Sequence, residues 1–137
     1  MKLLVLTSEP ITAEQLREVA GGDADPAEAE VMVVAPALQE NALHFWLSDA
    51  DEAIAKADAV RRETIAQLDA DGVPASGDTG ESDPLAAITD ALQTFDADRI
   101  VLFTHTDSNQ RYREDQLDPA EVQERFGRPV DQAAVSG

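Results

Sequence analysis

The sequence predicts an α/β fold, a five-stranded parallel sheet with helices on both faces. Two short runs, residues 2–6 and 31–34, carry the continuous β-branched and leucine residues typical of buried parallel strands. Segments with helical spacing and recognisable start signals lie between and after these runs. Because strands alternate with helices and their crossovers are right-handed, we expect a doubly wound, Rossmann-like three-layer sandwich with strand order 3-2-1-4-5.

A chain of 137 residues fits a single domain, 1–137, whose one core buries roughly two-thirds of the unfolded surface. The longest apolar runs are too short to cross a bilayer, and no leader-like segment opens the chain. We therefore expect a cytoplasmic protein. The absence of cysteine excludes disulfides, thiolate metal sites and cysteine nucleophiles.

The formal net charge is −18, and Lys2 and Lys56 are the only lysines. This balance argues against nucleic acid or an anionic membrane as a partner, since both are bound mainly through lysine and arginine. Such a surface suits a protein kept soluble in concentrated salt, but a merely acidic protein has it too. Residues 1–98 hold 5 basic and 21 acidic groups, whereas residues 99–128 hold 5 and 6, so an anion-binding surface is expected in the second segment.

The first half of the chain contains two predicted helices. Thr12 and Gln15 have the spacing of a capping box, and Gly21-Gly22 ends the helix that they open. The second strand ends at Ala35-Pro36. Ser48 can cap the longest helix, which Gly72 closes. The apolar stripe expected on this helix consists of Ala50, Ile54, Ala57, Ile65 and Leu68.

The second half repeats the alternation. Residues 73–79 are predicted as the third strand from their place between two helices, and Asp83 with Pro84 opens the next helix. Residues 100–103 form the fourth strand. Asp118, Pro119 and Gly127 mark the start and the end of the last helix. Residues 129–135, although polar and alanine-rich, are the candidate fifth strand.

Ligands of doubly wound sheets bind outside the carboxyl ends of the strands, where the strand order reverses. For the predicted order this point lies between strands one and four. A phosphate loop there needs glycine, because a Cβ prevents backbone N–H groups from closing around a phosphate, and residues 105–126 contain none. The predicted walls are the strand-end residues Thr7, Ser8, Ala35, Pro36, Thr104 and His105.

Side chains of the following loop offer a replacement for the missing amides. Arg111 and Arg113 can hold phosphate oxygens bidentately, and Ser108 and Asn109 can add neutral hydrogen bonds. Alternatively, this is a solvated loop whose arginines pair with acidic neighbours. The hydroxyls of Thr7 and Ser8 likewise either bind a ligand or satisfy backbone groups as the chain leaves the sheet, and we favour the second.

His105 is either a general base or ligand contact, or a structural hydrogen-bonding residue. Its spacing from His44 matches no metal-ligand pattern, so we expect no metal. No nucleophile and base can be paired from the sequence, which leaves no catalytic residue to assign and makes hydrolysis the third choice of function.

Several motifs carry a resemblance to a known family. They are Val34-Ala-Pro-Ala-Leu38, Trp46-Leu-Ser-Asp-Ala-Asp51, Gly80-x-x-Asp83-Pro-Leu85, Asp90-Ala-Leu92, Phe95-x-Ala-Asp98 and Thr104-His105. Over nearly its whole length the chain resembles universal stress proteins, and within them a small uncharacterised subgroup. The resemblance implies a fold of the adenine nucleotide alpha hydrolase-like type and a homodimer formed through the last strand.

One branch of that family binds ATP, and its motif is missing here. Its members follow strand four with Gly-x-x-Gly and then Gly-Ser or Gly-Thr, whereas this chain has Thr106-Asp-Ser-Asn-Gln-Arg-Tyr-Arg-Glu-Asp115. Thr7-Ser8-Glu9 replaces the family's Asp after strand one. We therefore expect a non-enzymatic, universal-stress-like protein with a regulatory or stress-related binding role and no cofactor. The alternative is a nucleotide or small-anion binder with an altered loop, for which ATP or another adenine nucleotide is the candidate ligand.

Overall fold

The computed structural model describes residues 2–20, 30–36, 50–73, 75–80, 84–105 and 118–135. The strands are β1 (Lys2–Thr7), β2 (Glu30–Pro36), β3 (Ala75–Gly80), β4 (Arg99–His105) and β5 (Val130–Val135). The helices are α1 (Ala13–Ala20), α3 (Ala50–Ala70), α4 (Pro84–Thr94) and α5 (Pro119–Phe126).

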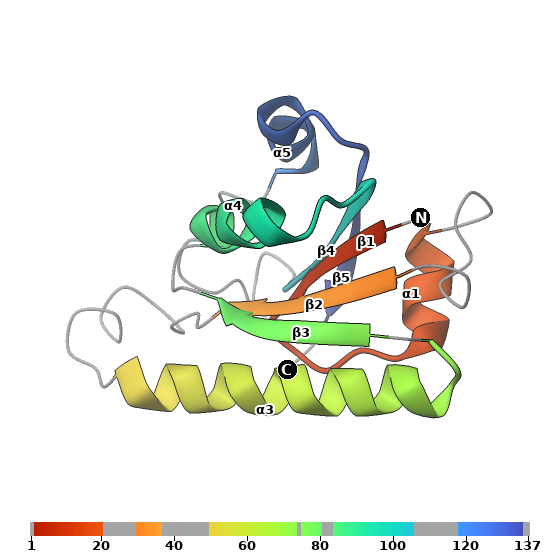
Figure 1. Cartoon of the computed structure of the whole chain (residues 1–137), viewed down its shortest axis with the longest axis vertical. Helices are drawn as coiled ribbons and strands as arrows, with labels where there is room; N and C mark the ends of the chain where they lie inside the picture. The colour runs from red at the N-terminus through yellow and green to blue at the C-terminus, as the bar shows by residue number, and fades with distance from the viewer. Residues whose placement is uncertain are drawn as a thin grey trace.

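All five strands are parallel, in the order β3-β2-β1-β4-β5. Figure 1 shows α4 and α5 on one side of this sheet and α3 on the other, and α1 packs on the same face as α3. The predicted fold class is confirmed, including the fifth strand.

The central strand β1 is buried from both sides. Leu3 and Val5 contribute to the core under α1 and α3, while Leu4 and Leu6 contribute to the core under α4 and α5. Successive side chains of a strand point to opposite faces, so a strand covered on both faces has no polar side. This placement explains the continuous apolar run at the start of the sequence.

The predicted helix caps are present wherever the structure describes them. The Thr12 N–H donates to Gln15 Oε1 at 2.9 Å, and the Gln15 N–H donates to Thr12 Oγ1 at 3.2 Å, which completes a capping box. Gly72 follows α3 with a φ of 79°, and Gly127 ends α5 with a φ of 66°, in the left-handed region that favours glycine. Gly21, Gly22, Ser48 and Asp83 lie outside the described residues.

The apolar stripe expected on α3 is wrong at Ile54, a residue that is 49% exposed. A helix of 21 residues is about 31 Å long, whereas the six residues of β3 span about 20 Å. The C-terminal end of α3 leads directly into β3, so the excess length extends from the N-terminal end, past the sheet (Figure 1). Among residues 54–70, the part of α3 whose burial is described, the buried residues are Ala57, Val60, Thr64 and Leu68.

Candidate functional site

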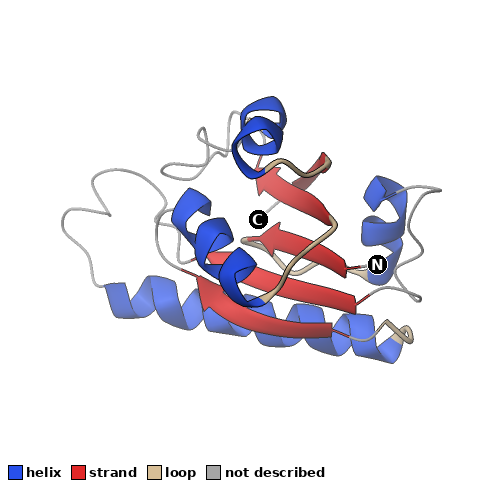
Figure 2. Cartoon of the chain, turned by 45° about the horizontal axis from the view of Figure 1, so that its top comes forward, coloured by secondary structure: helices blue, strands red, loops and turns tan. Residues whose placement is uncertain are grey.

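Parallel pairing brings the carboxyl ends of the strands to one edge of the sheet. Thr7 is paired with Phe103, Pro36 with Gly80, and His105 with Val135. In Figure 2 the strand arrowheads point toward this edge. The strand order reverses between β1 and β4, so the switch point lies where the sequence predicts it.

The hydroxyl of Thr7 is engaged by the backbone that follows β1. Thr7 is buried, its Oγ1 donates to the Glu9 carbonyl oxygen at 2.6 Å, and it accepts from the Glu9 N–H at 3.3 Å. Such a turn satisfies backbone groups as the chain leaves the sheet. These contacts correspond to the interpretation that the sequence favours, and they fix the position of Glu9.

Thr104, on the neighbouring strand, faces the opposite side of the sheet. Along β1, Thr7 alternates with Leu6 and belongs to the face of α1 and α3, whereas Thr104 follows Leu102 on the face of α4 and α5. Thr104 is buried, and its Oγ1 accepts a hydrogen bond from Gln132 Nε2 at 2.8 Å. The two threonines therefore lie at the same edge of the sheet, but their side chains are on opposite faces of it.

The remaining predicted residues divide into two groups. Ala35 is fully buried and packs against Ala57 and Val60 of α3, which leaves its backbone as the part that a ligand could meet. Pro36 and His105 end their strands at the same edge. Ser8 lies just beyond β1. The predicted anion-binding side chains of Ser108, Asn109, Arg111 and Arg113, together with His44, lie outside the described residues.

The structure adds two residues to this edge that the sequence does not suggest. Glu9 follows β1 by two residues, and its Oε1 lies 3.4 Å from Nζ of Lys56, in the second turn of α3. The Glu9 side chain is 13% exposed and that of Lys56 is 54% exposed. Because 47 residues separate the two, only the fold brings them together.

The N-terminus of α5 is capped by its own chain. Asp118 Oδ1 accepts a hydrogen bond from the Ala120 N–H at 3.0 Å, and Pro119, at the first helical position, has no N–H. Helix N-termini bind phosphate through free N–H groups and the positive end of the helix dipole. Here a carboxylate occupies that position, so an incoming phosphate meets a negative charge.

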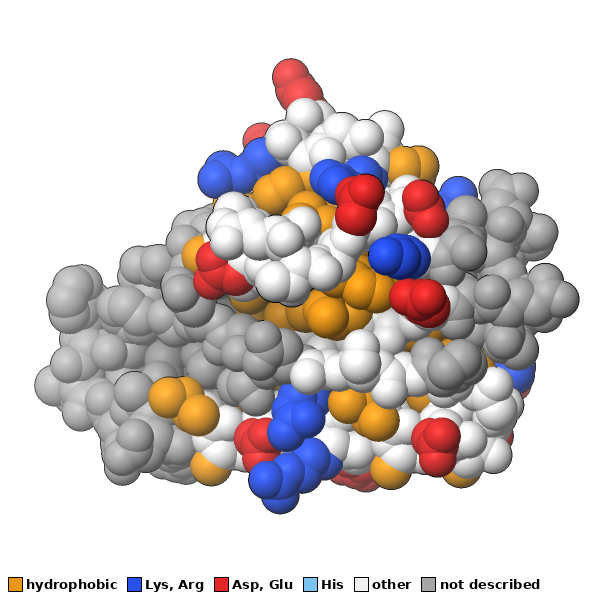
Figure 3. All heavy atoms as spheres, viewed as in Figure 1, with side chains coloured by type: hydrophobic (Ala, Val, Ile, Leu, Met, Phe, Trp, Pro, Cys, Tyr) orange, Lys and Arg blue, Asp and Glu red, His pale blue; other side chains and the backbone are white. Residues whose placement is uncertain are grey.

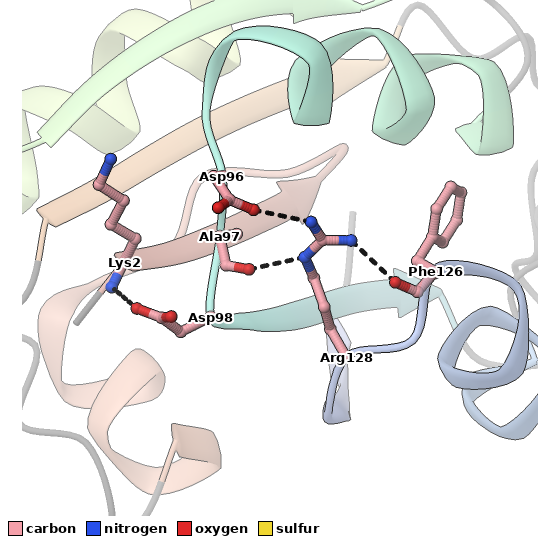
Figure 4. A network of polar contacts seen from close by, with 6 residues as sticks. All are labelled: Lys2, Asp96, Ala97, Asp98, Phe126 and Arg128. Atoms are coloured by element: carbon pink, nitrogen blue, oxygen red, sulfur yellow. Dashed lines mark hydrogen bonds and ion pairs between the residues drawn. The ribbon is translucent and has the colours of Figure 1, made fainter.

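A second set of ion pairs and hydrogen bonds lies at the opposite edge of the sheet, the amino edge, where the strands begin (Figure 4). The guanidinium of Arg128 donates to the Ala97 carbonyl at 2.7 Å, to the Phe126 carbonyl at 2.8 Å and to Asp96 Oδ1 at 2.8 Å. The Lys2 N–H donates to Asp98 Oδ2, also at 2.8 Å. These contacts tie the loop after α4 to β1 and to the turn before β5, far from the carboxyl ends of the strands.

A surface hollow of about 230 Å³ lies between α4 and α5. Figure 3 shows apolar side chains between these two helices. The hollow is small beside ligand pockets, which measure roughly 300–1,000 Å³, and it lies on a face of the sheet. Its lining residues are Leu85, Glu121, Val122, Glu124 and Arg125.

The described residues hold neither a candidate metal site nor a candidate membrane-spanning helix. Among them no group of three or more His, Asp or Glu side chains could hold a metal ion. No helix within the same ranges is long and apolar enough to cross a membrane.

Comparison with known proteins identifies the fold. No protein-family profile matches the chain, and no curated protein resembles it in sequence. Among solved structures, the hypothetical protein MJ0577, studied as a test case for structure-based assignment of biochemical function, superposes with a TM-score of 0.60 at 14% identity, covering 99% of this chain and 96% of that one. A protein from the universal stress protein family of Burkholderia pseudomallei superposes with a TM-score of 0.52 at 15% identity, covering 96% and 94%. The chain therefore has a universal-stress-protein-like fold.

Proposed function

We propose that this protein is a cytoplasmic member of the universal stress protein family with a regulatory or stress-related binding role, and that it is neither an enzyme nor an ATP binder of the usual type. The fold supports the family. The observation that carries the second part is the N-terminus of α5, where Asp118 caps the helix and Pro119 removes an N–H. A phosphate cradle needs free amides at this position.

The same proposal includes a homodimer formed through β5. In the described part of the chain β5 has one strand neighbour, β4, so its outer edge carries backbone groups that a second strand can pair with. The ion pair between Arg99 Nη1 and Asp131 Oδ2, at 2.7 Å, fastens β5 to β4. Sedimentation at high protein concentration, in low and high salt, tests this part, and a monomer under both conditions contradicts it.

Thermal shift with ATP, ADP, AMP and inorganic phosphate at millimolar concentration tests the binding part. A ligand that binds the native state alone raises the melting temperature. We expect no shift with ATP at low or high salt. A clear shift of the parent protein with ATP overturns the proposal.

A second candidate function, a small-anion binder at the carboxyl edge, is supported by the ammonium group of Lys56 there. The predicted roles of Arg111 and Arg113 belong to this alternative. A phosphate-induced shift that disappears in the Arg111→Ala/Arg113→Ala double variant supports those roles. Absence of a shift with every anion rejects the alternative.

A further inference from the structure

We propose that Lys56 is the phosphate-binding group of the carboxyl-edge site and that Glu9 competes with the ligand for it. A small phosphorylated ligand, or inorganic phosphate, binds by taking Lys56 from the Glu9 carboxylate. This inference rests on the second candidate function, because it names the cation of that anion site.

The Glu9 carboxylate is held in place by its surroundings. The two hydrogen bonds between the Thr7 hydroxyl and the Glu9 backbone fix the turn after β1, and 13% of the Glu9 side chain is exposed. A carboxylate with so little access to water is stabilised by a nearby cation, since burial without one is unfavourable. Lys56 supplies that cation in the ligand-free protein.

Lys56 is free to move where Glu9 is not. Its neighbour Ala57 packs on Ala35 at the end of β2, which anchors the helix, while the Lys56 side chain is 54% exposed. A lysine ammonium has three donors on a flexible stem, and the contact with Glu9 Oε1, at 3.4 Å, is long for a charged hydrogen bond. The ammonium can turn toward a ligand without any change in the backbone.

Several other basic side chains of the described region contact groups away from Glu9. Arg61 and Arg62 both pair with Asp58, and Arg128 binds Asp96 at the amino edge. Nζ of Lys2 lies 5.5 Å from the centre of the Phe95 ring, also at that edge. In a chain with a net charge of −18, a phosphate needs a local cation, and Lys56 contacts the segment that follows β1 at the carboxyl edge of the sheet.

Substitutions of Lys56 and of Glu9 should change the affinity for phosphate in opposite directions. Substitutions in a salt bridge with a purely structural role would not do so. Titration calorimetry of the full chain with inorganic phosphate provides the measurement. We expect Lys56→Gln to weaken phosphate binding about tenfold or more, because the cation is lost. Glu9→Gln should strengthen it about threefold to tenfold, because the competitor is lost and the charge on Lys56 remains. Lys56→Arg keeps the charge and should retain binding.

Matched controls separate this effect from a change in net charge. Arg62→Gln removes a positive charge from the same helix, and Glu14→Gln removes a negative charge from the exposed face of α1. We expect both to bind phosphate as the parent protein does, with circular dichroism verifying the fold of each variant. Equal effects of Lys56→Gln and Arg62→Gln, or of Glu9→Gln and Glu14→Gln, overturn the assignment.

Phosphate binding by the parent protein distinguishes a wrong assignment of Lys56 from the absence of an anion site. If the parent protein binds phosphate and neither Lys56 nor Glu9 matters, the function stands and its cation lies elsewhere, so the inference is wrong. If neither the parent nor the Glu9→Gln variant binds phosphate at tens of millimolar, the function and the inference are both rejected.

Discussion

Gly77 of β3 lies directly against Ile65 of α3. A Cβ atom at Gly77 would lie 2.6 Å from Ile65 Cδ1, 2.9 Å from Arg61 Cγ and 3.0 Å from the Val33 carbonyl oxygen. The long helix therefore packs on the backbone of β3, with no side chain at this position to hold the two apart. This close approach explains how a strand of sequence Ala-Ser-Gly-Asp-Thr-Gly belongs to the sheet without an apolar run of its own.

Substitution of Gly77 by alanine should destabilise the protein. The added methyl group would overlap two side chains of α3 and a backbone oxygen of β2, so the helix must shift. Overpacking of this kind typically costs about 1–3 kcal/mol. We expect a decrease of that size in the free energy of unfolding, measured by urea denaturation. Ser76→Ala, at the exposed neighbouring position, is the control, and equal stability of the two variants contradicts the packing argument.

Elements with local signals could be predicted from the sequence. The runs that became β1, β2 and β4 are apolar because they are buried from both sides, and the capping residues of α1 and α5 act within four positions of one another. The third strand could be placed only by elimination, and its predicted start, Val73, lies two residues before Ala75. Its stability comes from contact with α3, which no local pattern records.

The candidate site was predictable in position but not in detail. The position of the switch point follows from the strand order. The opposite orientation of the Thr7 and Thr104 side chains depends instead on which residues of each strand face which side of the sheet. Contact between Glu9 and Lys56 joins segments 47 residues apart, and in the sequence Lys56 resembles any solvated helix lysine. The exposure of Ile54 likewise depends on the relative lengths of α3 and the strands.

Replacement of Thr64 by valine should leave stability unchanged or raise it. Thr64 is fully buried in α3, and its Oγ1 has no hydrogen-bond partner among the residues that the structure describes. A buried hydroxyl without a partner costs about 1–3 kcal/mol, and valine fills nearly the same space without it. We expect an increase of up to about 1 kcal/mol in the free energy of unfolding.

The control for this prediction is Thr89→Val. Thr89 is exposed, and its Oγ1 donates to the Leu85 carbonyl oxygen at 2.9 Å, so it loses a contact and gains no burial. Urea denaturation compares the two variants with the parent. A marked loss of stability in Thr64→Val would show that the hydroxyl has a partner.

The ion pairs of Asp58 should make stability depend on pH in the acid range. Arg61, which donates a hydrogen bond to the carboxylate, and Arg62 lower the pKa of Asp58 below its ordinary value of 3.8. A carboxyl whose pKa is lower in the folded state stabilises the protein above its unfolded pKa. That contribution is lost as the pH falls through the folded pKa.

Asp58→Asn tests this dependence. The variant should melt below the parent protein at neutral pH, and the difference should shrink as the pH falls below 3.8 and disappear below the lowered pKa of the folded state, where the parent carboxyl is also neutral. Asp69→Asn, an exposed position near the end of the same helix, is the matched control and should lack this pattern. A difference that stays constant from neutral to acid pH contradicts the role of the two arginines.

Salt should stabilise the folded state, because the acidic groups that give the 137-residue chain its net charge of −18 repel one another in the compact form. The screening length falls from about 10 Å at 0.1 M salt to about 3 Å at 1 M, which removes most of this repulsion. We expect the melting temperature to rise steeply with KCl up to about 1 M, where screening nears completion. A Glu14→Lys/Glu18→Lys variant, altered at two exposed positions of α1, has less repulsion and should show a smaller rise. If the melting temperatures of both proteins rise equally, salt acts by strengthening apolar burial and not by screening charge. The acidic surface then does not make the fold depend on salt.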